Sequence, residues 1–96
     1  MYEKTVDCGA LKDNAYTDIP LGSTYSKIVS ISGMMYHQVT SGYDAHSVAI
    51  PCVWMDEGKF TGIQLYMYRD KIRIRSFSNV STFYTKSEVT VRYIKD

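Results

Sequence analysis

The sequence has few residues that could fasten a small protein by covalent or metal links, because it contains only two cysteines, Cys8 and Cys52, and two histidines. The two thiols could pair, but their spacing matches neither a disulfide framework nor a paired metal motif. An unpaired cysteine behaves as a small hydrophobic residue. We therefore expect two free, buried thiols.

The sequence also lacks the charge and the apolar runs that nucleic-acid binding and membrane insertion require. The net charge is +1, and the one basic cluster, residues 69–75, is interrupted by Asp70. A nucleic-acid interface needs clustered lysines and arginines to displace counterions from phosphates. The apolar stretches are far shorter than the ~20 residues that cross a bilayer, and residues 1–7 carry acids where a signal peptide would be basic. We expect no nucleic-acid partner, no membrane insertion and no secretion by a signal peptide.

Helical periodicity is absent as well, since no window repeats apolar residues at the spacing of an amphipathic helix. Nine tyrosines, together with many valines, isoleucines and threonines, favour strands instead. A chain of 96 residues is long enough for one domain and too short for two. These features predict a single all-β domain over residues 1–96, built as a small antiparallel, jelly-roll-like β-sandwich of about six to eight short strands.

The strand pattern occurs in residues 2–7, 16–21, 27–37, 48–55, 63–75 and 89–93, with a polar and aromatic loop expected over 76–86. In the segment 27–37, Val29 and Ile31 share one face, and Gly33 marks either a bulge or a close approach of two backbones. In the last segment, Val89 and Val91 alternate with polar residues. Alternation of this kind predicts strands with one face buried and one face exposed.

Segment 48–55 reads VAIPCVWM and is apolar on both faces, so it needs cover from two sides. One cover is the domain's own core. We expect the other to be a neighbouring subunit, because a thin sandwich has few interior strands. Val53 and Met55 are the candidates for the subunit contact if Ile50 and Cys52 face the core. The proline of this segment cannot donate a backbone hydrogen bond, which predicts an edge or a bulge there.

The clearest pattern in the chain is the hairpin expected in IQLYMYRDKIRIRS. A two-residue turn at Asp70 and Lys71 gives three opposed pairs: Met67 with Ile74, Tyr68 with Arg73, and Tyr66 with Arg75. The first pair would then point inward and the other two outward. The outward tyrosines either contact a neighbouring subunit or stiffen the sheet by cation–π contacts with the arginines.

Five segments follow one another along the chain from Tyr2 to Lys95: YEKTVDCGAL, KIVSISG, VAIPCVW, IQLYMYRDKIRIRS and EVTVRYIKD. Their order resembles that of the C-terminal domains of bacteriophage tail-fibre and minor structural (receptor-binding) proteins. Lys12 departs from that pattern, in which a proline is common, and segments 43–47 and 78–86 are this chain's own. The resemblance implies a β-sandwich that assembles as a homotrimer at the distal end of a virion, built in the cytoplasm of the bacterial host.

The chain contains no recognisable set of nucleophile, base and orienting group, so we expect neither an enzymatic activity nor a cofactor. Its only imidazoles are those of His37 and His46. Asp44 with His46 makes at best part of a cation site, and Asp56 with Glu57 makes at best part of a calcium site. A solvated loop and a polar turn are the favoured interpretations, and we expect no metal.

The aromatic side chains outnumber what a small core can hide, so some are expected to contact partners or sugars. Trp54 belongs either to the core, which we favour, or to a ligand contact. Loops at one end of a sandwich can present binding residues without disturbing the core. The candidates on the two long loops combine stacking faces with hydrogen-bonding groups, which suits a sugar. They are Tyr43, Asp44, His46, Phe83 and Tyr84.

These expectations combine into one function, a virion structural module that trimerises and attaches to a polysaccharide of the host cell surface. The candidates for the trimer contact are Val53, Met55, Tyr66 and Tyr68. The alternative is a capsid-decoration or baseplate protein that holds other virion proteins and has no host ligand. A glycan-binding measurement distinguishes the two.

Overall fold

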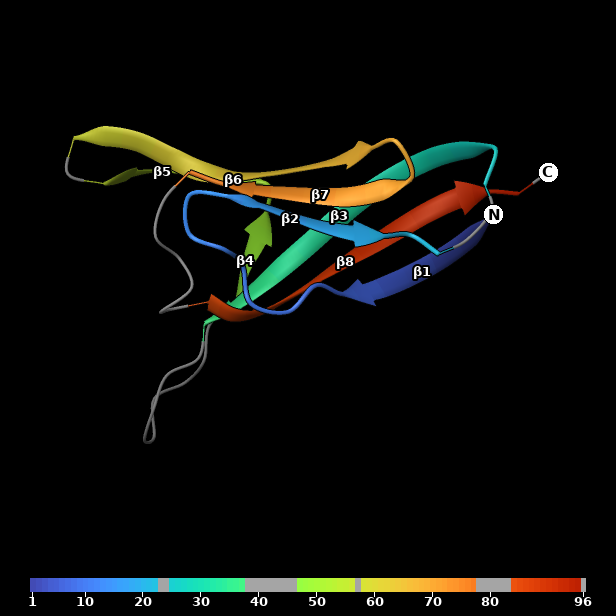
Figure 1. Ribbon diagram of the computed structural model, residues 1–96, viewed down its shortest axis with the longest axis horizontal. Helices are drawn as coiled ribbons and strands as arrows, with labels where there is room; N and C mark the ends of the chain where they lie inside the picture. Colours follow the sequence, from blue (N-terminus) through green and yellow to red (C-terminus); the bar gives the residue numbers. More distant parts are fainter. Residues whose placement is uncertain (23–24, 38–46, 57, 78–83, 96) are drawn as a thin grey trace.

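The computed structural model describes residues 1–22, 25–37, 47–56, 58–77 and 84–95 (Figure 1). These residues form eight strands and no helix. The strands are β1 (Tyr2–Asp7), β2 (Tyr16–Pro20), β3 (Lys27–His37), β4 (Ser47–Ile50), β5 (Cys52–Asp56), β6 (Lys59–Tyr68), β7 (Lys71–Ser76) and β8 (Tyr84–Ile94).

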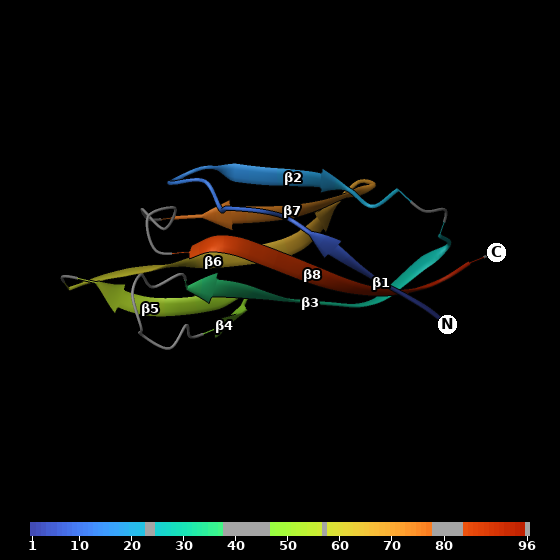
Figure 2. The same ribbon diagram turned by 90° about the horizontal axis from the view of Figure 1, so that it is seen from below.

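The strands form two four-stranded antiparallel sheets that enclose one core (Figure 1). Sheet A has the order β1-β8-β3-β4, and sheet B has the order β2-β7-β6-β5. Figure 2 shows β2, β7 and β6 side by side. The first and last strands, β1 and β8, pair with each other in sheet A, and β2 pairs with β7 in sheet B. The prediction of a small antiparallel β-sandwich with six to eight strands is confirmed.

The core lies between the sheets and follows from the alternation of side chains along the strands. Ile72 and Ile74 of β7 in sheet B are fully buried, as are Val89 and Val91 of β8 in sheet A. The residues between them are less buried, because successive side chains of a strand point to opposite faces. The other buried hydrophobic side chains are Cys8, Leu11, Leu21, Met35, Ile50, Ile63, Leu65 and Tyr93.

The connections between the sheets also contribute to the core. Cys8 follows β1 and donates its backbone amide to the carbonyl of Ser87 at 2.9 Å, while the Ser87 hydroxyl donates to the carbonyl of Gly9 at 2.8 Å. Cys8 is buried and Cys52 is half-buried, and both are free thiols, as predicted. Burial, with a smaller effect of Asp7, raises the pKa of Cys8 to about 11.

Segment 48–55 is not one strand, which corrects the prediction. It breaks at Pro51, where the preceding peptide bond is cis, and the chain passes from β4 in sheet A to β5 in sheet B. Both strands lie at the edge of their sheets, where a proline without an amide hydrogen is tolerated. Val48 and Ile50 before the break and Cys52 and Trp54 after it face the same core. Val53 and Met55 remain 74% and 56% exposed.

The hairpin between β6 and β7 is confirmed, but its predicted turn and register are wrong. The turn lies at Arg69 and Asp70, and Arg69 has φ 57°. The observed pairs are Met67 with Ile72, Leu65 with Ile74, Tyr66 with Arg73, Tyr68 with Lys71 and Gln64 with Arg75. The register differs from the predicted one by two residues, so every side chain stays on its expected face.

Strand β3 contains a bulge that the sequence pattern did not indicate. The register with β8 shifts at Val29, which is 43% exposed, whereas Ile28 and Ile31 pack against the core. The expectation that Val29 and Ile31 share a face is wrong, because one extra residue reverses the alternation. Gly33 marks a close approach, since a Cβ there would lie 2.8 Å from Cγ1 of Ile50.

The loop expected over residues 76–86 is shorter at both ends. Ser76 is the last residue of β7 and is buried, and β8 already begins at Tyr84. Tyr84 pairs with His37 at the end of β3, so β-forming residues continue the ladder further than the polar composition indicated. Residues 78–83 lie outside the described part of the chain.

Candidate functional site

The outer face of sheet B carries a continuous stack of cationic and aromatic side chains. We call it the arginine–tyrosine ladder; its members, in spatial order, are Arg69, Tyr68, Arg73, Tyr16, Arg75 and Phe77. Each arginine has its guanidinium carbon between 3.9 and 5.5 Å from the centroid of a neighbouring ring. Exposed cation–π contacts are worth about 0.5–1 kcal/mol each. The ladder therefore holds long side chains in defined orientations on the surface.

The ladder follows from the alternation in β7 and from the register of its two neighbours. Burial of Ile72 and Ile74 turns Arg73 and Arg75 to the outer face. Tyr16 of β2 lies directly opposite Arg75. Strand β6 contributes Tyr68 from the other side, so rings and guanidinium groups from three adjacent strands interleave.

Arg73 is neutralised by a carboxylate within the ladder. Its Nε lies 2.7 Å from Oδ1 of Asp18 and its Nη2 lies 2.8 Å from Oδ2. This two-point geometry is the strong form of an arginine–carboxylate contact. The hydrogen bond to Arg73 lowers the pKa of Asp18, and the hydrogen bonds to Asp18 and then to Tyr66 raise the pKa of Arg73.

A pH prediction follows from the lowered pKa of Asp18. A carboxylate with a depressed pKa in the folded state stabilises the protein. This contribution is complete above the pKa of the unfolded chain, 3.8, and is lost as the pH falls through the pKa of the folded state. We expect the Asp18→Asn variant to be less stable than the parent at pH 7, and the difference between their urea midpoints to shrink below pH 3.8. A difference that stays constant through this range would contradict the pairing.

Arg75 differs from Arg73 in having no carboxylate partner among the described residues. Its guanidinium carbon lies 5.0 Å from the ring centroid of Tyr16 and 4.4 Å from that of Phe77. The residues opposite Arg75 on the two neighbouring strands are Tyr16 and Gln64, neither of which is an acid. Within the part of the chain that the structure describes, Arg75 is therefore an oriented cation without a counter-charge.

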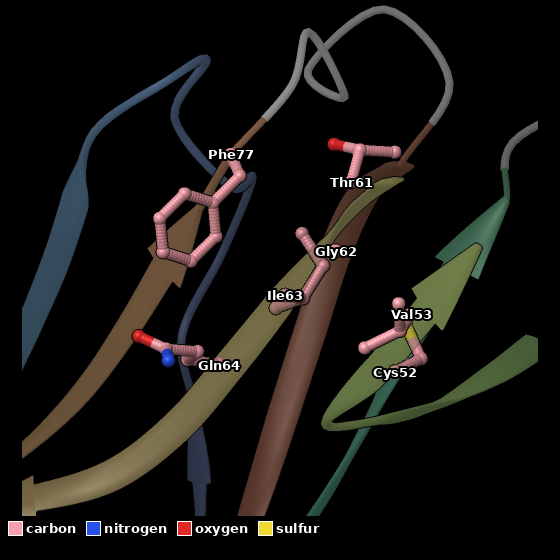
Figure 3. Close-up of a pocket in the computed structure, with 7 residues that line it drawn as sticks. All are labelled: Cys52, Val53, Thr61, Gly62, Ile63, Gln64 and Phe77. Atoms are coloured by element: carbon pink, nitrogen blue, oxygen red, sulfur yellow. The ribbon is translucent and has the colours of Figure 1, made fainter. Parts of the chain in front are cut away.

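An apolar groove of about 300 Å³ adjoins this end of the ladder. It is lined by Cys52, Val53, Thr61, Gly62, Ile63, Gln64 and Phe77. Figure 3 shows Phe77 and Gln64 on one side of Gly62, and Val53 and Cys52 on the other. The Thr61 hydroxyl is buried in the wall of the groove without a hydrogen-bond partner.

Gly62 is required by close packing of the backbones that carry the groove. A Cβ at this position would overlap the carbonyl oxygen of Cys52 on the neighbouring strand. We expect Gly62→Ala to lower the free energy of unfolding by about 1–3 kcal/mol, because the two strands must separate. Urea unfolding followed by far-ultraviolet circular dichroism measures this effect, and an unchanged midpoint would contradict the close approach.

A smaller polar cluster lies on the outer face of sheet A. The Tyr36 hydroxyl donates to Oε1 of Glu88 at 2.5 Å, and this hydrogen bond raises the pKa of Tyr36. Nζ of Lys86 lies 5.8 Å from the Tyr36 ring centroid. Tyr36, Glu88 and Lys86 thus satisfy one another across β3 and β8, which makes the cluster a stabilising contact between strands.

Of the predicted ligand-binding residues, Tyr43, Asp44, His46 and Phe83 lie outside the described residues. Tyr84 is the first residue of β8, where it is half-buried and packs against the core. The prediction that it lies on a loop is therefore wrong. Tyr84 lines a cavity of about 270 Å³ with Met35, Val48, Cys52, Val53 and Trp54. Trp54 packs against the core, the interpretation favoured from the sequence.

The strand ends that flank the two predicted loops do lie together. Tyr36 pairs with Ser47 across β3 and β4, and His37 pairs with Tyr84 across β3 and β8. The described residues that border the two segments therefore lie at the same end of sheet A. Ligand binding by the loops stays a prediction.

The candidates for the trimer contact occupy two places on sheet B. Val53 and Met55 are the exposed apolar residues of the edge strand β5. Tyr68 belongs to the ladder and is 40% exposed, and Tyr66 is half-buried beside it. The cation–π contacts expected for the tyrosines of β6 occur at Tyr68, with Arg73 at 3.9 Å.

Sequence reasoning did not identify Tyr16, Asp18, Gln64 or Phe77 as site residues. The signal in the sequence was the alternation of Tyr16 and Asp18 with Thr17 and Ile19, which predicts an outward aromatic and an outward acid on one strand. That pattern does not say which strand lies alongside. Their contacts with β7 come from the β2–β7 pairing.

Metal and membrane features are absent from the part of the chain that the structure describes. Within it, no group of three or more histidine, cysteine, aspartate or glutamate side chains is placed to bind a metal ion. The same residues contain no helix with the length and apolar character needed to span a membrane.

Comparison with protein-family models, curated proteins and solved structures finds no match to this chain. The fold and the site together define a small β-sandwich with a rigid cationic and aromatic sheet face. The resemblance to phage tail-fibre domains stays a prediction, because none of the comparisons supports it.

Proposed function

We propose that this protein is a non-catalytic attachment module of a virion that assembles as a homotrimer and binds a polysaccharide of the host cell surface. The observation that carries the proposal is the arginine–tyrosine ladder. Its residues Tyr16, Tyr68 and Phe77 are 40–43% exposed on one sheet face. Exposed aromatic rings that are held in place by their neighbours are well suited to bind a ligand that is itself partly apolar.

The chemistry of a sugar matches this surface. A pyranose ring has apolar faces, which stack on aromatic rings, and hydroxyl edges, which need hydrogen-bond partners. Gln64 and the arginines supply such partners beside the rings of Tyr16 and Phe77. The cation–π contacts also restrict the side chains before binding, which reduces the entropy lost when a ligand orders them.

Assembly is supported by the edge strand β5. Val53 and Met55 present apolar surface beside unpaired backbone groups of the edge, a combination that favours contact with another chain. A single sugar site on one subunit would bind weakly. Several copies on an assembled fibre raise the effective affinity without new contacts.

The same exposed surface of β5 also favours a second candidate, a capsid-decoration or baseplate component. In such a protein, Val53 and Met55 would contact another virion protein, and the ladder would stiffen the sheet without binding a ligand. The two functions differ in one measurable property, because only the attachment module binds polysaccharide.

The test of the proposal removes two exposed rings of the ladder. We expect the double variant Tyr68→Ala/Phe77→Ala to lose roughly tenfold or more of its affinity on an array of bacterial surface glycans, since two stacking contacts are lost. Tyr2→Ala is the matched control. Tyr2 is 50% exposed and stacks on Tyr93 in sheet A, away from the ladder.

A third variant separates the ladder from the predicted loop site. Loss of glycan binding in Tyr43→Ala, with full binding in the ladder variant, would transfer the site to the loops. Absence of binding to every glycan by the parent protein would favour the decoration or baseplate function.

A further inference from the structure

We propose that the ladder and its groove select a sugar that carries a carboxylate, a uronic acid residue, with Arg75 as the residue that binds the carboxylate. This inference rests on the proposed glycan-binding function and specifies its ligand. The geometry that points to it is the contrast between Arg73 and Arg75, two arginines that alternate on the same strand and the same face.

Arg73 shows how this surface binds a carboxylate. Both of its hydrogen bonds to Asp18 come from the N–H edge of the guanidinium, while the Tyr68 and Tyr16 rings lie 3.9 and 4.5 Å from its central carbon. Stacking on rings uses the faces of a guanidinium and leaves its edge for hydrogen bonds. The same side chain therefore combines both contacts.

Arg75 makes the same kind of stacking contacts as Arg73 but has no carboxylate partner among the described residues. The rings of Tyr16 and Phe77 lie against its guanidinium, and no ion pair is formed by Arg75 within the described residues. Its neighbours across both strands are uncharged. A planar carboxylate from a ligand would supply the partner that Asp18 supplies to Arg73.

The groove places the rest of the sugar next to this cation. Phe77 lines the groove and also contacts Arg75, and Gln64 lies opposite Arg75 and lines the groove as well. A volume of about 300 Å³ is at the lower end of the range for ligand pockets, which suits one sugar ring. The exposed Gln64 amide provides hydrogen-bonding groups for its hydroxyls.

The experiment compares polymers that differ only in the carboxylate. Polygalacturonate, alginate and hyaluronan are each tested against their carboxyl-reduced forms, in which the acid has become a hydroxymethyl group. Binding is measured by biolayer interferometry with the full chain. We expect the parent protein to bind at least one of the acidic polymers roughly tenfold more tightly than its reduced form, because a charge-assisted two-point contact is lost on reduction.

Variants of β7 assign the effect to Arg75. Arg75→Gln is expected to abolish the difference between the acidic and the reduced polymer, because it lowers the affinity for the acidic polymer more than the affinity for the reduced one. Lys71→Gln removes the same charge from the same strand and the same outer face, four residues further from the groove, and it is expected to retain the difference. Equal losses in the two variants would indicate attraction by overall charge and would overturn the inference.

The remaining outcomes separate this inference from the function on which it rests. Equal binding of acidic and reduced polymers by the parent would overturn carboxylate selection and leave glycan attachment standing. Tighter binding of a polyglycerol phosphate chain than of any uronate polymer would overturn the choice of carboxylate in favour of phosphate. Binding of none of these polymers, or of any other glycan, would overturn both proposals.

Discussion

Replacement of Ile74 by alanine is expected to lower the free energy of unfolding by about 2–5 kcal/mol. Ile74 is fully buried in the interior strand β7, between Thr17 of β2 and Leu65 of β6. Its truncation removes apolar contacts and leaves a cavity. The cavity cannot close, because β7 is held in place by hydrogen bonds to both adjacent strands, β2 and β6. A domain of this size has a total stability of only about 5–15 kcal/mol, so this one substitution removes a large share of it.

Urea unfolding followed by the fluorescence of Trp54 measures the change, because Trp54 packs against the core. The control is Val53→Ala, which removes apolar atoms from a side chain that is 74% exposed and is expected to change the stability of a subunit little. Similar losses in both variants would show that the core does not lie between the two sheets as described.

The burial of Ile74 was predictable from the sequence, because strict alternation over β6 and β7 identifies an inner and an outer face. The register of the hairpin was not. Turns at residues 69–70 and 70–71 give registers that differ by two residues, and a period of two places the same side chains inward in both. Alternation alone therefore fixes the faces of a strand and leaves its partner residues open.

The apolar pattern of segment 48–55 also did not predict the change of sheet at Pro51. Eight consecutive apolar residues look the same whether they form one strand covered on two sides or two short strands that share one core. The structure has the second arrangement, with β4 and β5 in different sheets. One apolar face of the predicted strand is thus explained by the domain's own core, and the need for a neighbouring subunit rests on Val53 and Met55 alone.

The arginine–tyrosine ladder was only half predictable, for a related reason. Outward arginines and tyrosines within the β6–β7 hairpin are close in sequence and follow from local alternation. Asp18 and Arg73, in contrast, are separated by 55 positions and meet only because β2 pairs with β7. Pairing between distant strands depends on the packing of the whole sandwich, which no local pattern specifies.

Assembly provides the second large effect, since replacement of Val53 by aspartate is expected to convert a homotrimer into monomers. Val53 is the most exposed apolar residue of the edge strand β5. If the trimer buries it, the aspartate would be desolvated in each contact without a partner, at a cost of several kcal/mol. In a closed ring every subunit repeats the same contact, so a single substitution weakens all of them together.

Light scattering at micromolar concentration measures the outcome, with a mass three times that of the chain expected for the parent and the mass of one chain for Val53→Asp. Val29→Asp is the control, because Val29 is an exposed valine of sheet A at the bulge in β3, and this variant should remain trimeric. A far-ultraviolet circular dichroism spectrum of monomeric Val53→Asp that matches the parent's would show that the charge acts on assembly and not on folding. A parent protein that is monomeric at this concentration, or a Val53→Asp variant that remains trimeric, would remove β5 from the subunit contact.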